Sequence, residues 1–184
     1  MKRILCFLLL AMLGTNRDAV ARPRPAEGGG GKHFEANKVF GLGIEVGEPT
    51  SINGKYFYSP DKAIDFGIGD TYNYNDYRGF TAYADHLWHP FVLASADSFE
   101  LPFYIGVGGR FWRFEDYRNR FYVNGDALGV RVPIGLAFDF NNVPLDVFIQ
   151  VVPTVDLFFN TPNGYDRTAY LWIDGSVGIR YWFK

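Results

Sequence analysis

The last stretch of the chain alternates strictly between two kinds of residue, and this pattern constrains the fold more than any other feature. From Leu171 to Phe183 every second residue is apolar, small or aromatic, whereas the residues between them include Asp174 and Arg180. Period-two alternation is the property of a β-strand with two different faces. A strand with one apolar and one charged face suits a barrel that is apolar outside and polar inside, which is the arrangement of membrane β-barrels.

Seven earlier segments show the same alternation, and long helical periodicity is absent. The sequence therefore predicts an all-β fold, an eight-stranded antiparallel up-and-down barrel whose last strand pairs with its first. Tight turns follow the second and sixth segments, and longer polar loops follow the third, fifth and seventh, as in outer-membrane barrels. The eight predicted strands are Val39–Val46, Ser51–Tyr58, Ala63–Gly69, Phe80–Trp88, Leu101–Trp112, Ala127–Phe140, Leu145–Leu157 and Thr168–Phe183.

The first 21 residues have the composition of a secretory signal peptide. A basic start precedes an apolar run that is too short to span a bilayer as a helix, and Ala19 and Ala21 form a small-residue cleavage site. The single cysteine, Cys6, lies in this segment, so the mature chain is expected to have no disulfide and no cysteine-ligated metal. Residues 22–36 are rich in Pro and Gly and predict a flexible linker, and residues 37–184 form the predicted barrel domain.

The charged residues of the predicted strands share one parity within each strand, so they are expected to face the lumen together. Without residues 1–21 the chain holds 15 basic and 19 acidic residues, which gives no basic surface for nucleic acid. Glycines recur on the charged face, where a narrow interior needs small residues beside arginines, and aromatic residues cluster near strand ends as interfacial girdles do. The predicted lumen charge network, a structural feature, comprises Glu45, Lys55, Asp65, Asp85, Arg110, Arg131, Asp156, Asp174 and Arg180.

With these eight segments, the signal peptide and the terminal aromatic strand, the chain resembles the small eight-stranded outer-membrane barrels of Gram-negative bacteria, the OmpA transmembrane-domain and OmpX type. The resemblance covers residues 37–184, and the stretch Pro144 to Phe148 also looks like a segment of uncharacterised bacterial barrel proteins. It implies an outer-membrane location, contact with lipid and lipopolysaccharide, and recognition of Leu171–Phe183 by the outer-membrane assembly machinery. In that group the terminal strand normally ends on Phe, whereas here Lys184 follows Phe183.

Three functions are compatible with this barrel. The first is a structural or surface-interaction role, with a salt-bridged lumen and external loops that contact a ligand, because Tyr and Arg are favoured at contact surfaces. The second is a narrow gated pore for small solutes. The third is a soluble, lipocalin-like, ligand-binding barrel in the periplasm or outside the cell, which periodicity alone does not separate from a membrane barrel. The candidate loop contact residues are Tyr74, Tyr77, Arg78, Tyr117, Arg118, Arg120, Tyr165 and Arg167.

Enzymatic activity is not expected. Some eight-stranded barrels modify lipid A, and one deacylase uses a His-x-Ser pair with a carboxylate, but here Trp88 occupies the position of the serine after His86. Asp85 points to the opposite face from His86, which is more simply an interfacial residue. His33, His86 and His89 form no metal-ligand pattern with carboxylates, and no phosphate-binding loop is present, so neither a metal nor another cofactor is expected.

Overall fold

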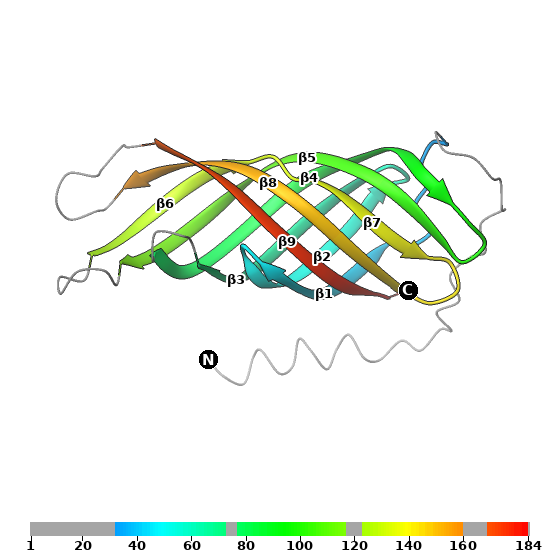
Figure 1. Ribbon diagram of the computed structural model, residues 1–184, viewed down its shortest axis with the longest axis horizontal. Helices are drawn as coiled ribbons and strands as arrows, with labels where there is room; N and C mark the ends of the chain where they lie inside the picture. The colour runs from blue at the N-terminus through cyan, green and yellow to red at the C-terminus, as the bar shows by residue number, and fades with distance from the viewer. Residues whose placement is uncertain (1–31, 73–76, 117–122, 160–168, 184) are drawn as a thin grey trace.

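The alternating segments fold into one antiparallel sheet that closes into a barrel (Figure 1). The computed structural model describes residues 32–72, 77–116, 123–159 and 169–183. Every pair of neighbouring strands is antiparallel. The strands are β1 Phe40–Gly47, β2 Thr50–Ser59, β3 Lys62–Tyr72, β4 Tyr77–Ser95, β5 Phe99–Asp116, β6 Val123–Arg131, β7 Ile134–Phe140, β8 Leu145–Phe159 and β9 Ala169–Phe183.

The nine strands occupy eight positions in the ring, because β6 and β7 are two halves of the predicted sixth strand. They lie one after the other between β5 and β8, and the break falls at Val132 and Pro133. Proline has no N–H to donate to a ladder, so the pairing is interrupted there. Hydrogen bonds from Gly106 N to Pro133 O, 2.8 Å, and from Val132 N to Pro153 O, 2.9 Å, hold the break against both neighbours.

The barrel closes between β9 and β1, as the sequence predicted. Phe40 pairs with Phe183 and Gly47 with Ser176. The strands are staggered along the ring. Following the paired residues from Ile44 on β1 through each neighbouring strand leads to Ala169 on β9, whereas Ile44 itself pairs directly with Ile179 on β9. The total stagger around the barrel is therefore ten residues. An eight-stranded barrel has an interior just wide enough for side chains to fill.

Strands β4 and β5 are longer than the sequence predicted. Strand β4 was expected to end at Trp88, before a connection that included His89 and Pro90, but it continues to Ser95 and forms a hairpin with β5. The register shifts between Trp88 and Phe91, where Pro90 lacks a backbone donor, so the strand passes the proline through an irregularity instead of ending there.

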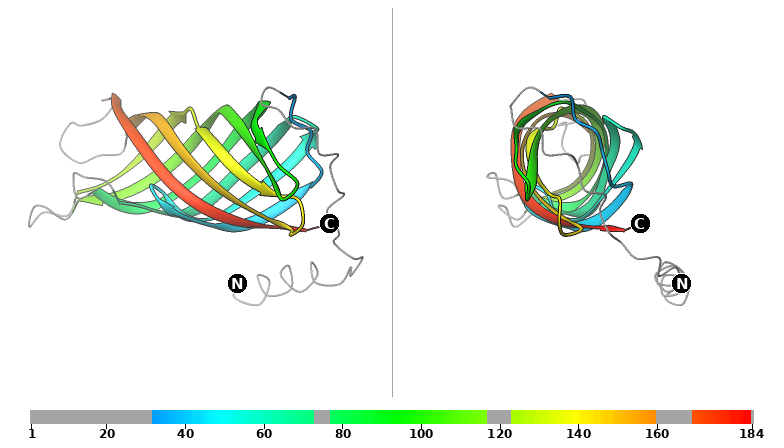
Figure 2. Two further views of the ribbon diagram at one scale, coloured as in Figure 1. Left: turned by 45° about the vertical axis from the view of Figure 1, so that its right-hand side comes forward. Right: turned by 90° about the vertical axis from the view of Figure 1, so that its right-hand side faces the viewer.

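Residues 32–38 lie across one end of the barrel, and we call them the strap (Figure 2). Val92 N donates to Lys32 O at 2.8 Å, and Ala36 N donates to Pro60 O at 2.7 Å. The end that carries the strap and the β2–β3, β4–β5 and β7–β8 turns is the strap end, and the opposite end is the loop end. The linker was expected to extend through Ala36, but residues 32–36 pack on the barrel because Phe34 is apolar and buried; residues 22–31 lie outside the described part.

The outer face of the barrel wall is apolar, and its inner face carries charged side chains. Outward-facing Ile173, Leu171 and Ile52 are 70%, 68% and 62% exposed, whereas inward-facing Arg180 and Asp156 are fully buried. Among the described residues, no helix has both the length and the apolar character needed to cross a membrane. The predicted parity is therefore confirmed for the charged residues of the predicted lumen network, which point inward, while the outer face between the strand ends is apolar.

Candidate functional site

The candidate site is the lumen, because all nine residues of the predicted lumen charge network are buried inside the barrel. The network divides into three groups along the barrel: one toward the loop end, one at mid-height and one toward the strap end. The predicted surface-contact residues are different: Tyr74, Tyr117, Arg118, Arg120, Tyr165 and Arg167 lie outside the described residues, Tyr77 belongs to β4, and Arg78 is exposed on β4.

Arg110 on β5 organises the group toward the loop end. Its guanidinium donates from Nε to Asp156 Oδ1 at 3.0 Å and from Nη2 to Asp156 Oδ2 at 2.5 Å, and it also reaches Asp174 Oδ2 from Nη1 at 2.6 Å. Thr154 donates a further hydrogen bond to Asp174, 3.2 Å long. Two-point contact with a carboxylate is the geometry that guanidinium favours.

Glycine makes room for this group on the lumen side. Gly129 is paired with Asp156 and also with Arg110, and a Cβ added to Gly129 would overlap Asp156 Oδ1. A Cβ on Gly108 would overlap Asp85 Oδ1 in the same way. The repeated glycines of the charged face therefore create space for buried side chains, as the sequence pattern indicated.

The middle group contains one ion pair, Arg131 with Asp85, and one carboxylate, Glu45, whose hydrogen-bond partners are uncharged. Arg131 Nε lies 3.2 Å from Asp85 Oδ2, and its guanidinium carbon stands 3.9 Å from the centre of the Tyr83 ring. Glu45 accepts hydrogen bonds of 2.7 Å from both Ser51 and the Tyr83 hydroxyl. Tyr83 was absent from the predicted network, although its inward parity on β4 was available as a signal.

Arg180 on β9 dominates the group toward the strap end. It donates to Asp65 on β3 and to Asp146 on β8, each at 3.1 Å, and lies 4.0 Å from the centre of the Phe148 ring. Since β3 and β9 are not neighbours in the ring, the contact with Asp65 crosses the interior. The contact of Arg110 with Asp174 crosses it in the same manner, from β5 to β9.

Lys55 is held differently from the arginines. Its ammonium nitrogen lies 2.8 Å from His89 Nε2, and 5.1 Å and 4.8 Å from the ring centres of Phe57 and Tyr104. His89 was excluded from the network because the strand was expected to end before it. The longer β4 places it inside the barrel, at the parity of Asp85 and Leu87.

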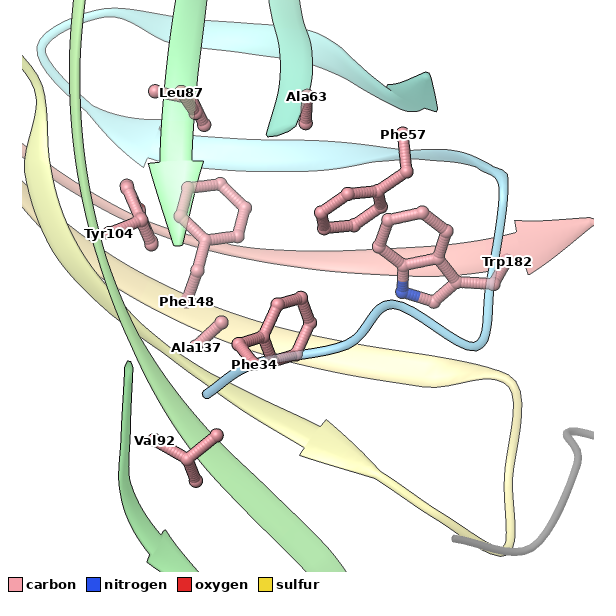
Figure 3. Packing of buried hydrophobic residues seen from close by; sticks show 9 residues of the cluster. All are labelled: Phe34, Phe57, Ala63, Leu87, Val92, Tyr104, Ala137, Phe148 and Trp182. Carbon is pink, nitrogen blue, oxygen red and sulfur yellow. The ribbon is translucent and has the colours of Figure 1, made fainter. Parts of the chain in front are cut away.

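The strap closes the lumen below Lys55. Phe34 is 2% exposed, and its ring centre lies 5.8 Å from that of Phe57 and 5.1 Å from that of His89. Figure 3 shows Phe34 among side chains that come from several strands, with Trp182 beside Phe57. Lys38 forms an ion pair with Asp139 and donates to Phe140 O at 2.8 Å. This closure depends on contacts between residues that are distant in sequence, which sequence periodicity does not predict.

Glu48 lies outside the strands, in the turn between β1 and β2, and its carboxyl group interacts with Asp174 and Arg110 of the loop-end group. Its partial burial and the nearby Asp174 carboxylate raise the pKa of Glu48 from its ordinary value of 4.5 to about 7, against the opposing effect of Arg110. Within the described residues, no group of three or more potential ligands is placed to hold a metal ion. The site thus consists of buried charges that are held by opposite charges, by polar side chains or by aromatic rings inside the barrel.

Taken together, the closed ring, the ten-residue stagger and the charge-filled lumen define a small antiparallel up-and-down β-barrel. The chain belongs to the family described as protein of unknown function (DUF3996), whose model matches residues 31–181. That match begins beside the strap, one residue before Lys32.

A solved structure shares this fold. The crystal structure of the N-terminal β-barrel domain of Pseudomonas aeruginosa OprF superimposes with a TM-score of 0.54 at 11% sequence identity. The superposition covers 78% of this chain and 95% of that domain. At this identity the likeness establishes the barrel fold alone. No curated protein matches the sequence.

Proposed function

We propose that the chain is a small integral outer-membrane β-barrel of a diderm bacterium, with a filled lumen and a structural or surface-interaction role. The observation that carries this proposal is the inverted polarity of the wall. Outward-facing Ile52, Val130, Leu171 and Ile173, on three different strands, are each at least 60% exposed, whereas charged side chains occupy the interior. Lipid is the solvent in which such a wall is stable.

The energetics favour lipid over water around the barrel. Monomeric soluble proteins rarely expose large contiguous apolar patches, whereas here apolar side chains surround the ring. Each fully buried apolar side chain contributes about 1.5–3 kcal/mol, so covering this wall with lipid tails stabilises the barrel substantially. The outward aromatic pairs Phe40–Phe183 and Phe91–Phe103, with ring centres 6.1 Å and 5.1 Å apart, stand near the strap end, where an interfacial girdle belongs.

The surface-interaction role is assigned to the loop end. Arg78 is exposed there, and the Tyr- and Arg-rich segments around Tyr74, Tyr117 and Tyr165, which lie outside the described residues, follow β3, β5 and β8 in the sequence. These residues would contact lipopolysaccharide and a surface ligand, and Leu171–Phe183 would be recognised by the assembly machinery. In this proposal the barrel is not an enzyme, because its lumen groups stabilise one another.

Cell fractionation combined with a heat-modifiability gel tests the proposal. The expected result is a band in the outer-membrane fraction that needs detergent for extraction and that changes mobility when the sample is boiled. Release of the protein by osmotic shock, without detergent, would support the soluble ligand-binding alternative and overturn the proposal.

A narrow gated pore is the second candidate. The observation that favours it is the strap, which closes one end while lying outside the strand ladder. Because the strap is not part of the wall, it can open without disturbing the wall. Single-channel recording in planar bilayers separates the candidates, since the filled lumen predicts silence.

A further inference from the structure

Near the strap end, the outer wall carries a group of polar and aromatic side chains that departs from its apolar pattern. Tyr58 on β2, Lys62 on β3, and His86 and Trp88 on β4 all lie at outward parity, and we call them the outer-wall cluster. Lys62 is paired directly with Trp88, and Ile64 with His86. Paired residues on one sheet face have Cβ atoms about 5 Å apart and diagonal neighbours about 7–8 Å, so Lys62 also lies beside His86.

Contacts within the cluster fix the imidazole and leave the cation available. The Tyr58 hydroxyl and His86 Nε2 are hydrogen-bonded to each other, and the His86 ring lies edge-on to Trp88 with centres 4.1 Å apart. Tyr58 is 48% exposed and Trp88 39%. Lys62 forms no ion pair with any residue in the described part of the chain, in contrast to the paired cations of the lumen.

The position of the cluster indicates what it meets. Toward the loop end the same face of the wall is apolar, because Ile64, Phe66 and Ile68 follow Lys62 at outward positions along β3. A lysine beside lipid at mid-depth is costly, but near the end of a strand its ammonium reaches the headgroup layer while its carbon chain stays on apolar surface. Tyr and Trp settle at the same level.

We propose that the outer-wall cluster binds the phosphate of a phospholipid headgroup in the leaflet at the strap end. Lys62 and the Tyr58 hydroxyl donate to phosphate oxygens, and the Tyr58 oxygen accepts the Nε2–H of His86. His86 is a positioning residue that orients the hydroxyl. The acyl chains lie along Ile64 and Val107, which flank His86 through its pairings with β3 and β5. This inference rests on the proposed membrane location, and it names a lipid that the location alone does not specify.

Native mass spectrometry of the full chain in maltoside micelles, titrated with phosphatidylglycerol, tests the proposal. The wild type is expected to retain one phospholipid molecule tightly. Tyr58→Phe and Lys62→Gln should each weaken this retention by about tenfold, because each removes one hydrogen bond to a charged phosphate. Lys62→Arg should keep most of the lipid retention of the wild type, since guanidinium also binds phosphate.

Tyr56→Phe is the matched control, because Tyr56 lies two residues away on the same face of β2 and is 44% exposed. It should bind lipid as the wild type does. Equal retention by the wild type, Tyr58→Phe and Lys62→Gln, with all three barrels heat-modifiable and inserted into phosphatidylglycerol vesicles, would overturn the lipid site and leave the membrane assignment intact. Failure of the wild type to insert into those vesicles would overturn both.

Discussion

At the scale of single residues, Arg110 is the side chain on which the loop-end half of the lumen depends most. It is paired with Asp156 and Asp174, and the side chains of all three are at most 3% exposed. Arg110→Ala leaves two carboxylates without their cation inside the barrel, and loss of one partner of a buried pair costs about 3–5 kcal/mol. Equilibrium unfolding in urea with lipid vesicles present should show this loss of free energy.

Arg113→Ala is the internal comparison for Arg110→Ala. Arg113 lies three residues further along β5 and is paired with Asp126 at 2.8 Å, but its side chain is 66% exposed. Exposed pairs contribute little to stability, so this variant should unfold as the wild type does. If Arg110→Ala unfolded at the same urea concentration as Arg113→Ala, the ion pairs of the lumen would not be stabilising the barrel.

Glu48 is expected to make stability depend on pH in an unusual direction for a carboxylate. Its folded-state pKa is raised from 4.5 to about 7, so the folded protein holds this proton more tightly than the unfolded chain does. The stabilisation is present in full below about pH 4.5 and is lost as the pH rises through 7. Glu48→Gln should therefore stabilise the barrel at pH 8 by about 1 kcal/mol, a figure reduced for partial solvent screening, and should have no effect at pH 4.

Unfolding free energies measured at pH 4 and pH 8 check this expectation. Asp97→Asn serves as the control because it removes an exposed carboxylate from the β4–β5 turn at the strap end, whereas the Arg110 group lies toward the loop end. A Glu48→Gln effect of the same size at both pH values would mean that the carboxylate acts through shape and not through its charge.

At the scale of elements, the strap should be separable from the barrel. The contacts that hold it include two backbone hydrogen bonds, the packing of Phe34 and the ion pair of Lys38 with Asp139, whereas ring closure between β1 and β9 does not involve it. Truncating a buried Phe to Ala costs about 3–5 kcal/mol, so Phe34→Ala should release the strap while the barrel stays folded. The buried interior near Ala63 should then become accessible from the strap end.

Thiol labelling measures this opening. In a Cys6→Ser background, Ala63→Cys places one buried thiol in the same buried cluster as Phe34, and Ala127→Cys places an equally buried thiol in the second aromatic cluster, with Trp112 and Phe158. Phe34→Ala should accelerate labelling at position 63 by about tenfold or more and leave position 127 unchanged. Equal labelling of position 63 with and without Phe34 would show that the strap does not seal the lumen.

Sequence periodicity predicted the parts of this fold that depend on alternation. It predicted closure of the last strand on the first and the burial of residues such as Arg180 and Asp65, because parity alone decides which face a side chain occupies. It did not predict that β4 continues beyond Pro90, since an irregularity within a strand and a turn have similar local chemistry. The burial of Phe34 was also missed, because a short segment outside the ladder has no period and is ordered only by side chains distant in sequence.

At the scale of the whole molecule, the lumen predicts an electrically silent barrel. Beyond the strap, the contacts of Arg180 with Asp65 and of Arg110 with Asp174 each cross the interior, and the pair of Arg131 with Asp85 lies at mid-height. Opening the strap end would therefore still leave the middle and loop-end groups in the way of an ion, because the interior of an eight-stranded barrel is only just wide enough for side chains.

Deletion of residues 32–38 distinguishes the filled barrel from the gated pore. Single-channel recordings in planar bilayers should show no conductance steps for the full chain and none for the deletion variant, provided that both remain heat-modifiable. Arg110→Ala combined with the deletion serves as the comparison, because it removes a side chain that crosses the lumen. Discrete openings that appear on strap deletion alone would show that the strap is the gate and that the ion pairs behind it separate to let ions pass. That result would favour the pore over the filled barrel.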